Sequence, residues 1–454
     1  MRRAGAAWLL VLGLASPAAA QSMDTYGMGS RSVALAGAVT ADVEDPSANY
    51  YNPAGIVRDG QLRILAGWFG AHHELTLDDE DSNVDPVHGL VVGLNVPGNI
   101  GDFRFAFGLG VHLNDQRVSR TRTLPRTRPR WELYDNRPHR AYLSTHVAIE
   151  PVPWLRFGGG IGFLSYSEVD LRIRGTIDVG APERGSALEH DVLGNLVTIR
   201  FPQVGVQVQP TDWLDFGAVY RGEYALSSDL HAQVGSPDFA GDDAAGLTVG
   251  SIYVPAYLEL LSASTGAYVP HQLSFGASVR PIPELRIGVE LTWLMWSLYR
   301  SAIGRTDIDF RIVVPPELGD RIRVPPLTNT QPVPARFSDR VVPRIGVEWR
   351  PHASPEVAVD LRGGYFYENS PAPEQADAYN LVDADRHAWS LGAGIELRAL
   401  RPLLPGSLRF DLHLQYSLLP ARAMTKRSPI DPTGDYVAQG HIFAGGLVTE
   451  VRFE

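Results

Sequence analysis

Phe103-Arg-Phe-Ala-Phe-Gly-Leu-Gly-Val-His-Leu-Asn114 is the stretch that decides the fold, because a large apolar side chain occupies every second position. The positions between them hold Arg, Ala, Gly, His and Asn, which are small or polar. A period of two is typical of a β-strand with one apolar face, whereas an amphipathic helix repeats about every 3.6 residues. Residues 62–69, 285–293 and 408–416 alternate in the same way, so the chain is predicted to be all-β.

Fourteen such segments follow one another along the chain. They begin near Leu62, Gly89, Phe103, Ala141, Leu155, Val197, Leu214, Gln272, Leu285, Val341, Val357, Ala388, Ser407 and Gly440. Their connections alternate between short, Pro-rich turns such as 151–154 and 210–213 and long, polar, irregular stretches. The long stretches are 115–140, 170–196, 226–271, 300–340, 368–387 and 417–439.

This alternation of loop lengths is typical of a bacterial outer-membrane barrel, which has tight periplasmic turns and long external loops. A soluble β-sandwich has no reason to sort its loops in this way. Residues 61–454 are therefore predicted to form a 14-stranded antiparallel transmembrane β-barrel in the outer membrane of a Gram-negative bacterium.

The start of the chain and its composition narrow the class further. Residues 1–20 combine a cationic start, an apolar stretch and small residues before Gln21, which predicts a secretory signal peptide. The longest uncharged apolar run, 4–14, is much shorter than the roughly 18 residues of a membrane-spanning helix. The 454 residues include 40 Lys and Arg, 51 Asp and Glu, and 0 Cys. The lack of Cys excludes disulfides and thiolate sites, and an acidic balance without a basic cluster argues against nucleic acid as a partner.

Aromatic residues gather near both ends of the predicted strands. Trp154, Trp213 and Trp349 lie beside short turns. Those toward the long connections are Trp68, Trp293, Trp296, Tyr365 and Tyr416. Two such groups are expected to form aromatic girdles at the two membrane surfaces.

Residues 21–60 lack the alternation and are rich in Gly, Ala, Ser and Asp, so they cannot form lipid-facing strands. Two motifs stand here, Gly27-Met-Gly29-Ser-Arg-Ser-Val-Ala-Leu-Ala-Gly37 and Ala41-Asp-Val-Glu-Asp-Pro-Ser-Ala-Asn-Tyr-Tyr-Asn-Pro-Ala-Gly55. Together they resemble the N-terminal region of the FadL/TodX-type outer-membrane transporters of long-chain fatty acids and hydrocarbons.

This resemblance implies a fourteen-stranded barrel plugged by a small N-terminal hatch at 21–60, with Asn52, Pro53 and Ala54 matching the hatch motif. It also implies that an apolar ligand is first held among external loops, then passes to a site inside the barrel, and leaves sideways through a gap at a kinked strand. A barrel of this size leaves a lumen too wide for wall side chains to fill, which independently favours a plug. The alternative for 21–60 is a flexible periplasmic tail.

Charged residues on the predicted wall strands share the phase opposite to the apolar residues. They are Arg104, Arg156, Arg286, Glu348, Arg362, Arg409, Asp411, Glu450 and Arg452. An Arg facing lipid at mid-membrane costs roughly 2 to 4 kcal/mol, so these side chains are predicted to face the lumen as an ion-pair network. The alternative is that one or two of the arginines bind a fatty-acid carboxylate. Glycine-rich runs at 157–162 and 392–394 are predicted to let the hatch or a ligand approach the wall.

The candidate metal and catalytic residues lack the required spacing. His112, His146 and His413 fall on different predicted strands, and Ser144 with His146 lacks an oriented acid partner. We therefore expect no metal, no cofactor and no catalytic residues, and a barrel hydrolase is the least favoured function.

Pro202 interrupts a predicted strand, because the apolar residues of 197–201 hold one phase and those of 204–208 the other. A proline cannot donate a hydrogen bond to the ladder, so the phase slip predicts a bulge or a wall kink, which would be the place for a lateral opening. The alternative, which we favour, places Pro202 at the end of the preceding loop and Phe201 outside the barrel.

Residues 246–261 are unusually apolar for an external loop. Solvent does not tolerate such a stretch unless it packs on another loop or on a ligand. It is the predicted surface for capturing an apolar ligand, with candidate contacts at Leu247, Ile252, Tyr253, Tyr257, Leu258 and Leu261.

The leading hypothesis is passive uptake of hydrophobic molecules such as long-chain fatty acids or hydrocarbons. Lipopolysaccharide blocks their direct partitioning, and an apolar groove recovers about 0.8 kcal/mol per buried methylene. The expected partners are these small molecules, outer-membrane lipid and lipopolysaccharide, and the barrel assembly machinery. The alternative is a FadL-like barrel that acts in protein secretion or surface assembly, which predicts a barrel without an acyl-sized cavity.

Overall fold

The computed structural model describes most of the chain between residues 23 and 453. The described residues are 23–115, 128–135, 142–178, 187–240, 244–249, 251–299, 305–316, 329, 334–376, 380–398, 400 and 405–453. The predicted signal peptide, 1–20, lies outside them.

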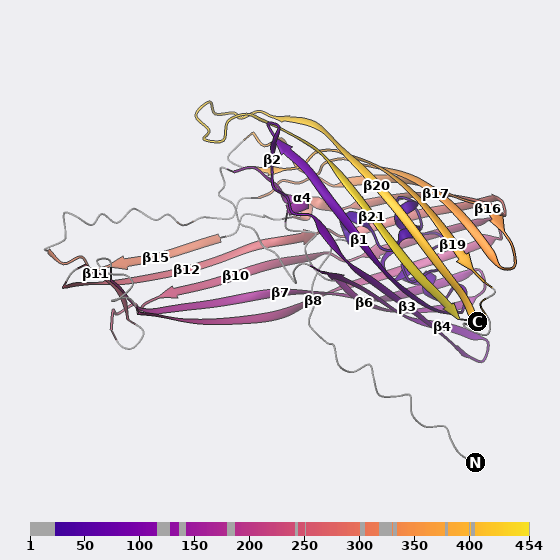
Figure 1. The fold of residues 1–454 in the computed structure, drawn as a ribbon, viewed down its shortest axis with the longest axis horizontal. Coiled ribbons are helices and arrows are strands. Elements are labelled where there is room, and N and C mark those ends of the chain that lie inside the picture. Colours follow the sequence, from indigo (N-terminus) through magenta and orange to yellow (C-terminus); the bar gives the residue numbers. More distant parts are fainter. Residues whose placement is uncertain are drawn as a thin grey trace, which may run out of the picture.

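Fourteen strands form a closed antiparallel barrel (Figure 1). In ring order they are β1 (Leu62–Leu77), β3 (Val87–Ile100), β4 (Phe103–Asn114), β6 (Tyr142–Val152), β7 (Leu155–Asp178), β8 (Ala187–Thr211), β9 (Leu214–Arg221), β13 (Gln272–Ile282), β14 (Leu285–Leu294), β16 (Arg340–Ala353), β17 (Val357–Glu368), β19 (Arg386–Leu397), β20 (Gly406–Met424) and β21 (Tyr436–Phe453). The ring closes where β1 pairs with β21, from Leu62 opposite Phe453 to Leu77 opposite Ala438. The prediction of an all-β, fourteen-stranded barrel is confirmed.

Alternation sorts the wall side chains between lipid and lumen. On β4, Phe107 is 54% exposed on the outside, whereas its neighbour Ala106 is buried. The short turns and the C-terminus lie at one end of the barrel, here called the short-turn end, and the long connections lie at the other, the long-connection end (Figure 1).

Aromatic side chains ring the outside at both ends. At the short-turn end these are the exposed Trp154, Trp213 and Trp349. At the long-connection end Tyr365, Trp389, Tyr416 and Phe443 follow one another around the wall, with successive ring centroids 5.6, 6.0 and 5.3 Å apart.

The girdle prediction is wrong for Trp296. This residue lies in η2 (Trp296–Leu298) and is 1% exposed. The chain has left the wall at this point, so the indole packs against Tyr268 and Phe337 inside the mouth of the barrel instead of meeting lipid.

The sheet of the barrel continues beyond the wall at the long-connection end, and this extension is here called the outer sheet (Figure 1). It consists of the outer parts of β7 and β8 with β10 (Tyr224–Val234), β11 (Ala245–Val249), β12 (Ile252–Val269) and β15 (Arg305–Ile312). β10 pairs in parallel with β7 and antiparallel with β12, and β12 pairs with β15, which gives the order β8–β7–β10–β12–β15. Irregular connections within 170–196, 226–271 and 300–340 were therefore wrong expectations for these strands. The apolar–polar alternation runs on through them, so the ladder continues past the membrane.

The remaining elements of the long connections are short. β2 (Glu80–Asp81) forms a hairpin on β1, and β5 (Arg130–Trp131) pairs in parallel with β18 (Leu381–Val382), next to α4 (Glu132–Asp135). Among the described residues, none of the helices has the length and apolar character needed to cross a membrane.

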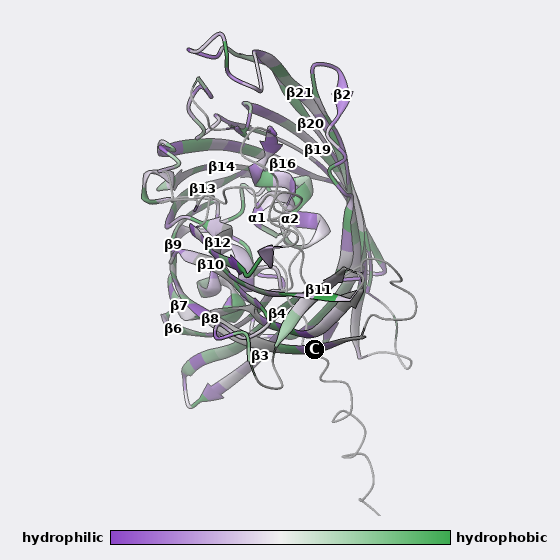
Figure 2. Cartoon of the chain, turned by 90° about the vertical axis from the view of Figure 1, so that its left-hand side faces the viewer, coloured by the Kyte–Doolittle hydropathy of each residue, from purple (hydrophilic) through white to green (hydrophobic). Residues whose placement is uncertain are grey.

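Residues 23–57 lie inside the ring of strands (Figure 2). They form α1 (Met23–Tyr26), α2 (Ser30–Ala34), α3 (Ala48–Tyr51) and η1 (Pro53–Val57). The chain turns sharply between these helices because Gly27, Gly29 and Gly37 take φ values of 82°, 76° and 78°, which L side chains rarely adopt. We call residues 23–57 the lumen segment.

Candidate functional site

The lumen segment is attached to the wall through Asn52, which follows α3 and precedes η1. Its buried amide donates to the carbonyls of Thr40 (2.8 Å) and Val206 (3.0 Å), and its oxygen accepts from the amide of Ala54 (3.1 Å). One side chain thus joins two turns of the lumen segment to strand β8. Pro53 and Ala54 lie in the first turn of η1, where a proline has no unsatisfied N–H.

Glycines on the wall strands make this close approach possible. A Cβ atom at Gly158 would lie 2.3 Å from the carbonyl carbon of Pro53, and one at Gly205 would lie 2.0 Å from the Asn52 oxygen. At Gly392 it would lie 2.5 Å from the Cβ of Ala34. The prediction that glycine-rich wall segments admit a close neighbour is confirmed, and the neighbour is the lumen segment.

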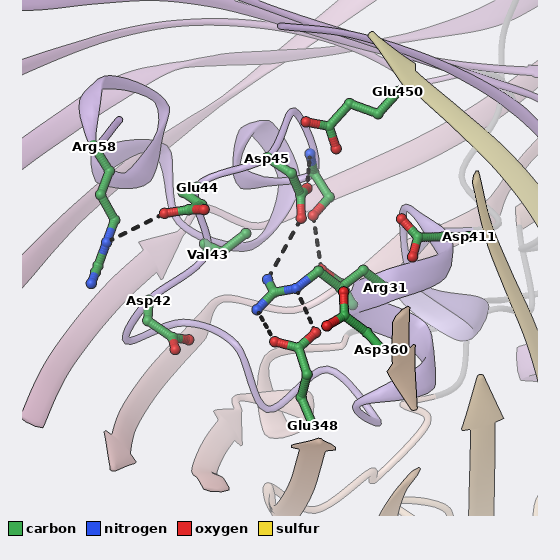
Figure 3. A network of polar contacts seen from close by, with 12 residues as sticks. Arg31, Asp42, Val43, Glu44, Asp45, Arg58, Glu348, Asp360, Asp411 and Glu450 are labelled. Atoms are coloured by element: carbon green, nitrogen blue, oxygen red, sulfur yellow. Dashed lines mark hydrogen bonds and ion pairs between the residues drawn. The ribbon is translucent and has the colours of Figure 1, made fainter. Parts of the chain in front are cut away.

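Ion pairs hold the lumen segment at the short-turn end of the barrel (Figure 3). Arg31 donates to both carboxylate oxygens of Glu348 at 3.0 and 2.9 Å and lies 3.7 Å from Asp45. Asp42 accepts from Arg286 at 2.5 and 2.6 Å. Burial favours the neutral carboxyl, but Arg286 outweighs it and holds the pKa of Asp42 well below its usual range.

The wall contributes a network of its own to this region. Arg362 contacts Glu348 (2.6 Å), Asp411 (2.7 Å) and Asp360 (3.2 Å), and Arg409 also pairs with Asp411. The predicted lumen network of mixed charge is confirmed. These groups surround a cavity of about 420 Å³ whose lining is almost entirely charged, here called the ionic floor.

The long-connection half of the lumen is aromatic instead. Tyr50 of α3 packs on Tyr142 with ring centroids 6.0 Å apart, Tyr142 on Phe201 at 6.4 Å, and Phe201 on Tyr224 at 5.2 Å. Tyr26, Phe69, Trp131, Tyr134 and Phe366 belong to the same buried cluster, which we call the aromatic chamber.

Two arginines connect the aromatic chamber to the lumen segment. Arg221 lies 4.1 Å from the ring centre of Tyr50 and pairs with Asp24 at 3.2 Å. Arg344 lies 4.5 Å from the ring centre of Phe366 and donates to the carbonyl of Ala36 at 3.0 Å. Among the described residues, Arg344 has no carboxylate within ion-pair distance. The cavity that both arginines line measures about 70 Å³, which is room for about two water molecules.

Comparison with known proteins identifies the family. A family model for the outer membrane protein transport protein family (OMPP1/FadL/TodX) matches residues 102–399. The chain belongs to this family. FadL/TodX-family proteins are transport barrels of the Gram-negative outer membrane, so the fourteen strands described above span that membrane.

Individual relatives of this FadL/TodX-family chain are distant. Alkane uptake protein A of Marinobacter nauticus is 23% identical over 449 residues, covering 93% of this chain and 90% of the relative. A FadL homologue of Pseudomonas aeruginosa has a TM-score of 0.55 at 13% identity, covering 94% of this chain and 98% of its own. The toluene transporter TbuX of Ralstonia pickettii has a TM-score of 0.50 at 16% identity, covering 94% and 99%. At these identities the solved structures establish the shared fold.

Pro202 of this FadL/TodX-family barrel lies within β8, not in a loop. Pairing with β7 runs without a register shift through Gly162–Phe201 and Ile161–Pro202, so both a bulge and an unpaired Phe201 are wrong expectations. The apolar phase changes because Phe201 turns into the aromatic chamber, whereas Val204 faces lipid. Ladder pairing between β8 and β9 begins at Gln203 opposite Arg221, and the last backbone contact on this side is the Gly222 amide, which donates to the Pro202 carbonyl at 2.8 Å, so the β8–β9 ladder ends at Pro202.

The candidate capture residues lie on the outer sheet but divide between its two faces. Leu247 is paired with Val254, so it belongs to the β11–β12 hairpin. By strand alternation Ile252 and Leu258 lie on one face, and Tyr253, Tyr257 and Leu261 lie on the other. The exposed members are Tyr253 and Leu261, whereas Tyr257 is buried and donates to Glu259 at 2.9 Å.

The lumen histidines serve as polar contacts to the lumen segment. His146 contacts the Asn49 side chain at 3.3 Å, and His413 contacts the hydroxyl of Ser30 at 3.0 Å. Ser144 donates to the carbonyl of Gly110, not to His146. In the described part of the chain, no three His, Asp or Glu side chains are grouped as a metal site would require.

Sequence reasoning missed Arg344 and Phe366, although a signal exists. Arg344 shares the inward phase of Glu348 on β16, and Phe366 shares that of Arg362 on β17. The phase gives the side of the wall but not the depth, so it could not separate the aromatic chamber from the ionic floor.

Proposed function

We propose that the chain carries hydrophobic molecules, fatty acids or hydrocarbons, passively across the outer membrane. The supporting observation is the division of the lumen into an aromatic chamber at the long-connection end and an ionic floor at the short-turn end. An aromatic chamber matches an apolar ligand, because burying each methylene there recovers about 0.8 kcal/mol. The relatives named for uptake of alkanes and toluene are consistent with this substrate class.

We further propose that residues 21–60 act as a hatch and 61–454 as the transporting barrel. Ion pairs from Arg31 and Asp42 of the lumen segment, and from Arg58 directly after it, fasten the proposed hatch to the wall. With this segment in place the chamber cavity of about 70 Å³ is too small for a long acyl chain. Ligand entry therefore requires that part of the lumen segment move, and Met23–Tyr26, which line the cavity, are the part that would move.

The ionic floor bears on the exit route. Passage of an apolar chain through a cavity lined by arginines and carboxylates would desolvate those charges without giving them partners. A sideways exit into the membrane avoids this cost. Pro202 is our candidate position, since the ladder between β8 and β9 ends there.

Capture is assigned to Tyr253 and Leu261, the exposed apolar side chains among the candidate residues. Changing both to Ser should lower uptake of a labelled ligand at low concentration and leave the heat-modifiable barrel unaltered. Normal uptake would place capture elsewhere. Outer-membrane lipid, lipopolysaccharide and the barrel assembly machinery remain the proposed partners in the membrane.

One experiment tests the function and the substrate together. Protein extracted gently from outer membranes is analysed by mass spectrometry for bound lipid, and cells are assayed for uptake of a labelled fatty acid and a labelled alkane. If fatty acids are carried, Arg344→Met should lower uptake of the acid alone, because this guanidinium is the candidate for the carboxylate. If neither compound binds or enters above the vector control, the transport proposal fails in favour of a secretion or assembly role.

A further inference from the structure

The outer sheet has one apolar face. Residues paired across a β-ladder point to the same side, so the register defines rows of side chains that cross the strands. One row contains Val192, Leu171, Ala232, Leu260 and Ile308, in the order β8–β7–β10–β12–β15. The next row on the same side contains His190, Ile173, Val234, Leu258 and Phe310. Nine of the ten residues in the two rows are apolar, and the exception is His190 on β8.

The row between them, on the other side, is polar. It contains Asp191, Arg172, Gln233, Glu259 and Asp309. These groups find partners within their own face, since Glu259 accepts from Tyr257 at 2.9 Å and lies 3.2 Å from His231. The polar face is therefore stable in contact with water. The apolar face of a sheet with such alternation normally packs against other protein.

The two rows are only partly covered in the described part of the chain. Val192 is 62% exposed, the other eight apolar side chains are partly exposed, and none of the nine belongs to either buried hydrophobic cluster. A contiguous apolar surface of this kind marks an interaction site.

The register also gives the direction of this face. β7 and β8 pair without a shift from Leu155 opposite Val208 to Thr176 opposite Ala187. Leu171 and Ile173 therefore share the side of Phe157 and Ile161, which face lipid on the barrel wall. The apolar face continues the lipid-facing wall outward, so it points sideways along the membrane.

We infer that this face packs against the same face of a second copy of the chain. Two barrels in one membrane stand parallel, and a two-fold axis along the membrane normal places their sideways faces opposite each other. Two sheets then pack face to face, about 10 Å apart, with the polar faces in water. Five strands about 4.8 Å apart and about ten residues long cover on the order of 800 Å², which is the area per partner of a standard stable interface.

Cross-linking tests the dimer directly, because the chain has 0 Cys. Full-length Ala232→Cys, at the middle of the apolar row, is oxidised in native outer membranes. Leu171→Cys and Leu260→Cys lie on the neighbouring strands in the same row. They detect the dimer if its two-fold axis passes one strand to either side of β10. The matched control is Gln233→Cys, the next residue on the polar face. We expect a disulfide-linked band of twice the monomer mass from at least one apolar-row variant and none from Gln233→Cys.

A second variant separates association from folding. Adding Leu258→Glu to the cross-linking variant should abolish the dimer band and leave heat-modifiable barrel in normal amount. Equal bands from both faces, or no band from any apolar-row variant, would overturn the inference. It is equally overturned if the introduced thiols stay unlinked but are shielded from a water-soluble maleimide, which would mean that another part of this chain covers the face. Shielding that appears only when liquid alkane is added would assign the face to the substrate.

Discussion

At the scale of single residues, the attachment of the lumen segment depends on wall glycines, which have no Cβ atom. Gly158 and Gly159 are neighbours on β7 but point to opposite sides. A Cβ atom at Gly158 would overlap Pro53, whereas one at Gly159 would lie 3.4 Å from the nearest side-chain atom, Cγ1 of Val204. The pair therefore offers a matched test.

Gly158→Val should displace the lumen segment from the wall and raise single-channel conductance in planar bilayers. Gly159→Val, with its side chain toward lipid, should leave the conductance at the wild-type level. Both variants should fold into heat-modifiable barrels, because the β7 ladder is retained. Equal conductance for the two variants would contradict a plugging role.

A buried carboxyl in the long connections gives a pH dependence. Burial raises the pKa of Asp383 to about 6, and the nearby Arg340 guanidinium offsets this only in part. The folded state therefore binds a proton that the unfolded state, with a pKa near 3.8, has released. Stability falls as pH rises from about 4 to 6, and the loss above pH 6 is about 3 kcal/mol.

Asp383→Asn removes this charge while keeping the shape of the side chain. We expect a higher thermal midpoint in detergent at pH 8 and little change at pH 4.5. Glu80→Gln, at the exposed β1–β2 hairpin, is the control and should shift neither midpoint. A gain of the same size at both pH values would show that Asp383 acts through packing instead.

At the scale of elements, the wall strands are predictable because lipid on one side and a filled lumen on the other impose a period of two. The same period continues in β10, β12 and β15, yet the alternation of short turns with long, polar stretches led us to expect irregular loops there. The sequence does not show where the membrane ends, so strands that extend beyond the membrane are mistaken for loops. The ionic floor could be predicted because Arg362 and Glu348 occupy inward-facing positions in the strand alternation. Its separation from the aromatic chamber depends on the position of each residue along the barrel axis, which the alternation does not give.

Pro202 is the test at this scale. Pro202→Val restores an N–H donor at the position where β8 loses β9, so it should strengthen the ladder there. Uptake should fall if the ligand leaves at this place, with unchanged amounts of folded barrel. Val204→Ile, two residues along the same strand and facing lipid, should leave uptake unaffected. Normal uptake by Pro202→Val would move the exit to another part of the wall.

At the scale of the whole molecule, the two ends of the barrel are chemically unlike, which gives the protein one orientation. The short-turn end should face the periplasm, as in other outer-membrane barrels. A tag at Asp238, beyond β10, should be labelled on intact cells. A tag at Asp212, in the turn between β8 and β9, should be labelled only after permeabilisation. The reverse pattern would overturn this topology.

The seam between β1 and β21 sets an order of events during biogenesis. Its strands are the first and last of the barrel, so the ring cannot close until the end of the chain has arrived. The lumen segment precedes β1 by only a few residues and would be excluded by a ring that had already shut. Closure of the seam must therefore trap a segment that is already in place, and variants that loosen the segment should slow the maturation of the barrel as well as open it.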